Sequence, residues 1–214
     1  MITFLSVLSS VAVIVYSVIA YAQYRSSNTQ HRERLRIEYL LRRRQAFGVW
    51  VQEYLHLTQV LVNASVQLDM DMLEDGYHGV LDDASEVQRR KARIAENSRS
   101  RDRNQVDLNY QMMMLNLVID ERKPYFKEAS AKIRENYQEV HGLLQGFEKL
   151  IFGELLPQMT APEIQTVAQF SEIMAEAREK ARDMNAQIEQ SNHTLGEQVR
   201  EDSHAMDDEV EGYF

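Results

Sequence analysis

The feature that most constrains this chain is a long stretch near its start that contains no charged side chain. Residues 2–24 read ITFLSVLSSVAVIVYSVIAYAQY and hold neither an acid nor a Lys or Arg. A helix of about 20 mainly apolar residues spans the hydrocarbon core of a bilayer, which is about 30 Å thick. The stretch therefore predicts a single transmembrane anchor in residues 1–24.

A cleaved signal peptide is the alternative interpretation of this stretch. Ala20-Tyr21-Ala22 has the small-x-small pattern of a cleavage site, and cleavage there would leave Gln23 as the first residue. However, no basic residue precedes the apolar stretch, and the stretch is longer than the 7–15 residues typical of signal peptides. We therefore favour a retained anchor.

The charges that flank the anchor predict its orientation. Residues 25–44 contain seven arginines and two acids, whereas no Lys or Arg lies before the anchor. The positive-inside rule then predicts an N-terminus outside the cell (inner) membrane and a cytoplasmic body. In this interpretation residues 25–44 form a basic juxtamembrane helix. The arginines expected to bind anionic lipid headgroups are Arg25, Arg32, Arg34 and Arg36.

Five residues of the anchor are predicted to make contacts in the membrane. Ser6, Ser10 and Ser17 fall near one helical face, and small residues on one face favour contact with another membrane helix. Serines that bond only to their own helix are the alternative. Tyr21 and Tyr24 match the aromatic belt expected at the inner interface.

The remainder of the sequence predicts an all-α fold. Glycine and proline number 8 and 3, which is about 5% of the chain where about 12% is usual. Apolar residues recur at heptad spacing, which is typical of packed long helices. Those of the first helix are Leu40, Phe47, Tyr54, Leu61 and Leu68, and those of a later helix are Phe126, Ile133, Val140, Phe147 and Ile151. We expect residues 45–205 to form a long antiparallel helical bundle or coiled-coil rod, followed by an acidic tail in residues 206–214.

Three boundaries within this bundle follow from local signals. Pro124 disfavours helical backbone at Lys123, so a helix is expected to break there, with a kinked continuation as the alternative. Another helix is expected to end near Pro157. Thr160, followed by Pro162 and Glu163, predicts the N-cap of the last helix.

The helix expected to start near Asp82 or Asp83 is the leading candidate for docking a partner. Its first half, EVQRRKARIAENSRSRDRNQ, has almost no apolar periodicity, and its second half is expected to pack into the core through an apolar row from Val106 to Leu117. The candidate docking residues are Arg89, Arg90, Arg93, Met112 and Met113. No aromatic residue lies between Tyr77 and Tyr110 to stack on bases, so a nucleic-acid partner is not expected.

The sequence offers little for catalysis or metal binding. Cysteine is absent, which excludes disulfides and thiolate chemistry. Glu53 and His56 have the Glu-x-x-His spacing of carboxylate-bridged metal sites, but the second such motif that those sites require is missing. We therefore predict no catalytic residue, no metal, no cofactor and no small-molecule substrate, and we expect the protein not to be an enzyme.

Together these features predict a membrane-anchored helical interaction or scaffold protein. Its expected role is that of an accessory or regulatory subunit of a membrane-associated assembly, with the bilayer and protein partners or other copies of itself as binding partners. Three alternatives remain open. One is a periplasmic or extracellular helical-bundle sensor, and another is a homo-oligomeric effector whose clustered spans perturb the bilayer. The third is a bundle enzyme with a carboxylate-bridged metal.

Overall fold

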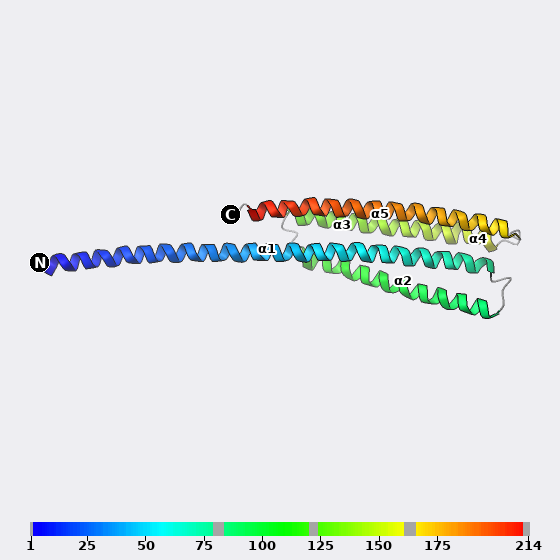
Figure 1. Cartoon of the computed structure of the whole chain (residues 1–214), viewed down its shortest axis with the longest axis horizontal. Coiled ribbons are helices and arrows are strands. Elements are labelled where there is room, and N and C mark those ends of the chain that lie inside the picture. Colours follow the sequence, from blue (N-terminus) through cyan, green and yellow to red (C-terminus); the bar gives the residue numbers. More distant parts are fainter. Residues whose placement is uncertain (1, 79–83, 120–123, 161–165, 212–214) are drawn as a thin grey trace. The chain divides into compact units, whose positions relative to one another are not determined.

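The computed structural model of the chain is all-α (Figure 1). It comprises α1 (Ile2–His78), α2 (Ala84–Val118), α3 (Pro124–Leu150), the π-helical turn η1 (Ile151–Leu155), α4 (Leu156–Thr160) and α5 (Val167–Glu211). The structure describes the backbone of residues 2–78, 84–119, 124–160 and 166–211, and the side chains of residues 19–76, 85–119, 126–159 and 166–202.

The chain divides into two compact units, which are described separately. One unit consists of Met1–Gln45 together with Met206–Phe214, and the other consists of Ala46–Ala205. The second unit is an antiparallel bundle of four helices, formed by the C-terminal part of α1 with α2, α3 and α5 (Figure 1). The predicted all-α antiparallel bundle is thus confirmed.

The heptad rows expected in α1 and α3 form the core of the bundle. Their apolar members from Phe47 to Leu68 in α1 and from Phe126 to Phe147 in α3 are all buried. Thr58 interrupts the companion row of α1, seven residues after Val51, yet it is also buried. Its hydroxyl donates a hydrogen bond to the Tyr54 carbonyl oxygen at 2.8 Å. A polar residue is tolerated in the core when its hydrogen bond is made locally.

The expected break before α3 is present, but the start of α5 differs from the prediction. α2 ends at Val118 and α3 begins at Pro124, where the missing N–H of a first-turn proline costs nothing. Thr160 is not an N-cap, because it is the last residue of α4. Instead, the Thr166 hydroxyl accepts a hydrogen bond from the Gln169 N–H at 3.3 Å, one residue before α5 begins. Thr166 is therefore the N-cap of α5, and Thr166-x-x-Gln169 has the sequence pattern of a capping box.

The helix expected to end near Pro157 continues through it to Thr160. The turn before this proline is the π-helical η1, and the Leu156 N–H donates to the Ile151 carbonyl oxygen. A proline inside an α-helix removes one hydrogen bond and crowds the preceding turn. The wider π-turn relieves this conflict, which explains why Pro157 does not end the helix.

α2 packs with a different face from the one predicted. Its buried apolar residues are Leu108 and Leu115, followed by Ile119 directly after the helix, whereas Val106, Tyr110, Met113 and Leu117 are exposed. The prediction that the row from Val106 to Leu117 faces the core is therefore wrong. We call these four exposed residues the outer α2 stripe.

The predicted anchor lies largely outside the described residues. Ser6, Ser10 and Ser17 are among those whose side chains the structure does not describe. Within the described part of the chain, no helix has an apolar stretch long enough to cross a bilayer. Tyr21, Tyr24 and the four arginines expected at the lipid headgroups are all exposed on α1. The anchor and its membrane contacts stay predictions.

Candidate functional site

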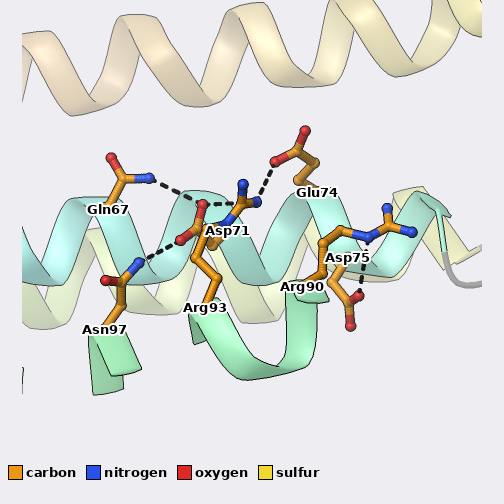
Figure 2. Close-up of polar contacts among 7 residues, drawn as sticks. All are labelled: Gln67, Asp71, Glu74, Asp75, Arg90, Arg93 and Asn97. Atoms are coloured by element: carbon orange, nitrogen blue, oxygen red, sulfur yellow. Dashed lines mark hydrogen bonds and ion pairs between the residues drawn. The ribbon is translucent and has the colours of Figure 1, made fainter. Parts of the chain in front are cut away.

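The first half of α2 is attached to α1 by a cluster of polar side chains around Asp71 (Figure 2). The buried Asp71 carboxylate accepts hydrogen bonds from Gln67 Nε2 at 3.0 Å and from Asn97 Nδ2 at 2.6 Å. Arg93 Nη2 lies 3.1 Å from Asp71 Oδ1 and also donates to Glu74 Oε2 at 2.9 Å. These contacts compensate the burial of the Asp71 charge, because a carboxylate out of water needs donors and a cation.

A second arginine of α2 is buried in the same interface. The Arg90 side chain is only 7% exposed, and its Nε lies 3.9 Å from Asp75 Oδ1 (Figure 2). Acids of α1 thus face bases of α2 along the first half of the interface. This explains how a segment with almost no apolar periodicity still packs as a helix.

The residues predicted to dock a partner are divided between this interface and the surface. Arg90 and Arg93 make contacts within the chain, and Met112 is partly buried. Arg89 and Met113 are exposed, and Met113 is 75% exposed. The predicted docking residues therefore do not form one exposed surface, and the exposed apolar residues of α2 are those of the outer α2 stripe.

Replacing Arg93 with Ala is expected to lower the free energy of unfolding by about 1–2 kcal/mol, because it leaves the buried Asp71 carboxylate without its cation. Arg89→Ala is the matched control, since Arg89 pairs with Glu86 at 3.5 Å on an open surface. That loss should stay below about 0.5 kcal/mol. Urea unfolding followed by circular dichroism compares the two variants, and equal losses would contradict the role given to Arg93.

Further along the bundle, residues of α1, α2 and α3 line an open polar cavity of about 210 Å³. Its charged and titratable lining residues are Asp69, Arg101, Asp102, His141 and Glu148. Asp69 is buried, and its Oδ1 accepts no hydrogen bond from the residues that the structure describes. Burial and the nearby Glu148 carboxylate raise the pKa of Asp69 to about 7, although Arg101 opposes the shift.

A third polar cluster joins α1, α3 and α5. The buried Tyr54 hydroxyl donates to Asn136 Oδ1 at 2.7 Å, and Asn136 Nδ2 donates to Ser191 Oγ at 2.9 Å. Burial raises the pKa of Tyr54, so its hydroxyl keeps its proton and acts as a donor. Beside this cluster, α3 and α5 form a groove of about 610 Å³ lined mainly by amide, hydroxyl and carboxylate side chains.

None of these clusters has the donor set of a metal centre. Among the described residues, no group of three or more His, Asp or Glu side chains is arranged to hold a metal ion. Glu53 and His56 are both exposed on α1. The described residues form polar contacts between helices and one exposed apolar row, the outer α2 stripe.

Comparison with protein-family models, curated proteins and solved structures gives no match. Functional inference for this chain therefore rests on its own residues. The outer α2 stripe is the feature that sequence reasoning assigned to the core. The sequence signal that could have identified this stripe is the presence of two apolar rows on α2. A helix that packs on one side only buries one of its two rows and leaves the other exposed.

Proposed function

We propose that the chain is a membrane-anchored helical interaction protein, an accessory or regulatory subunit of a membrane-associated assembly with its body in the cytoplasm. The observation that supports a binding role is the outer α2 stripe, whose four side chains are between 58% and 75% exposed. Contiguous exposed apolar residues on a helix are typical of interaction surfaces. The bundle already buries a second apolar row of α2, so the stripe is not needed for its own core.

The support for membrane attachment comes from the sequence. Residues 2–24 are uncharged, and seven arginines follow within residues 25–44. An anchor of this kind confines the bundle to a membrane surface, where α2 meets partners held at the same surface. The exposed Tyr21 and Tyr24 and the exposed arginines after them have the order expected at a lipid interface.

Membrane attachment and orientation are tested with a single engineered thiol. Because the chain contains no cysteine, Ser100→Cys on the exposed surface of α2 provides the sole thiol. We expect the full-length protein to stay in membranes after alkaline extraction and to react with a membrane-impermeant maleimide only after cell lysis. Release from the membrane would contradict the anchor, and labelling in intact cells would favour an external sensor.

A further inference from the structure

Two basic side chains precede the outer α2 stripe on the same face of the helix. Arg99 and Arg103 precede Val106 by seven and three residues, and both are exposed. The steps from Arg99 through Arg103, Val106, Tyr110 and Met113 to Leu117 alternate between four and three residues, which keeps these residues on one face of the helix. The exposed face of α2 is therefore basic toward its first half and apolar toward its second half.

The chain itself contains a segment with the complementary composition. Residues 203–214 read SHAMDDEVEGYF and contain four acids and no Lys or Arg. Met206, Val210 and Tyr213 are spaced by four and three residues, the same steps as in the outer α2 stripe. The backbone of α5 is helical as far as Glu211, so the first two of these residues belong to a helix.

We infer that the outer α2 stripe, with Arg99 and Arg103, binds the acidic C-terminal segment (residues 203–214) of a second copy of this chain. This inference rests on the proposed function, because an anchor concentrates all copies at one membrane surface and raises their effective concentration. In the resulting contact the two helices are antiparallel, and Met206 and Val210 pack on Tyr110 and Val106 of the stripe. At a rise of about 1.5 Å per residue, Glu211 then lies close to the level of Arg103 and pairs with it. Asp207 and the other acids add to the attraction of the segment to the basic end of this face.

The test measures self-association of the full-length chain in detergent by analytical ultracentrifugation. Met113→Lys and, separately, Tyr110→Lys are expected to weaken association at least tenfold, as is removal of residues 203–214. Both side chains are exposed, so circular dichroism should show unchanged folding. Val49→Lys, at an equally exposed apolar residue of α1, is the matched control and should associate as the parent does.

Charge exchange tests the pairing itself. Arg99→Glu with Arg103→Glu should disrupt association, and so should Asp207→Arg with Glu211→Arg. The variant that carries all four substitutions should restore it. Every variant keeps residues 2–24. If the chain associates through the predicted anchor instead, association persists in all of the variants, and that result would overturn the inference.

Two further results would also overturn it. If the parent chain is monomeric, the segment does not bind a second copy. A monomer would also be observed if the segment bound α2 of its own chain, and this outcome too would contradict the inference. Failure of the fourfold variant to associate would exclude the proposed charge pairing. None of these results bears on alkaline extraction or maleimide labelling, so failure of the inference can be told apart from failure of the proposed function.

Discussion

Replacing Asp69 with Asn is expected to stabilise the full-length protein by about 2–3 kcal/mol more at pH 8 than at pH 5. The cause is the buried position of Asp69 in the cavity between α1, α2 and α3, where its pKa is raised to about 7. In an unfolded chain the same carboxyl has a pKa of about 4. The folded protein therefore retains a proton at pH 5 that the unfolded chain has already lost.

The direction of the pH dependence follows from this difference in bound protons. Between about pH 4 and pH 7 the folded state binds more protons at Asp69 than the unfolded state does, so the contribution of this group to stability falls as the pH rises. Above pH 7 both states are ionised and the loss is constant. The interval from pH 5 to pH 7 covers two pKa units, and each unit corresponds to about 1.4 kcal/mol.

The comparison uses urea unfolding of the parent and the variant in the same detergent at the two pH values. Asn cannot ionise, so any fixed cost of placing its amide in the cavity is equal at both pH values and cancels in the difference. Asp107→Asn is the control, because Asp107 is exposed on α2 and lies outside the cavity. A stability difference between parent and Asp69→Asn that does not change with pH would contradict the assignment.

The sequence predicted those helices whose buried face follows one clear apolar row. In α1 and α3 a single heptad row is both the most apolar and the one that packs, so periodicity identified the core from Phe47 to Leu68 and from Phe126 to Phe147. The buried Thr58 and Ser65 did not disturb the prediction, because the apolar residues on either side of them establish the same face.

The packing of α2 could not be predicted in the same way. Its second half carries two apolar rows, and periodicity alone does not indicate which of them a neighbouring helix covers. Its first half packs through Arg90, Arg93 and Asn97, whose partners Asp71 and Asp75 lie on α1. To predict a polar interface, one must know which residues of the two helices lie opposite each other. That alignment is seen only in the three-dimensional structure.

The polar groups of the candidate sites escaped prediction for a related reason. Asp69 and Asn136 belong to no motif, and each is distinguished only by what surrounds it. Asp69 lies in a cavity beside a carboxylate from α3, and Asn136 connects a tyrosine of α1 to a serine of α5. The capping box at Thr166, by contrast, was present in the sequence, but Pro162 and Glu163 supported the earlier threonine instead.

Removing the side-chain amide of Asn136 is expected to cost about 2–3 kcal/mol of unfolding free energy. Asn136→Leu keeps a similar volume but leaves the buried Tyr54 hydroxyl without its acceptor at 2.7 Å. An unpaired buried polar group carries its full desolvation penalty, about 1–3 kcal/mol. The same substitution also removes the donor to Ser191 Oγ, which weakens the attachment of α5 to α3.

A double-mutant cycle separates these contributions. Tyr54→Phe alone should cost about 1–2 kcal/mol, because it leaves Asn136 Oδ1 buried and without this donor. Combined with Asn136→Leu, it removes the unpaired hydroxyl as well, so the double variant should be more stable than the sum of the two losses predicts, by about 1–2 kcal/mol. Tyr110→Phe on the exposed face of α2 is the control and should be close to neutral.

The sign of that coupling decides what holds α1 against α3 at this level of the bundle. If the two losses simply add, the hydrogen bond between Tyr54 and Asn136 contributes nothing of its own. Apolar contacts between α1 and α3, such as that of Phe47 with Phe126, whose ring centroids lie 5.4 Å apart, then account for the stability. If they couple as expected, the polar pair selects the register in which the Tyr54 ring is buried. A shift of α3 by one residue would then bury both the hydroxyl and the amide without partners.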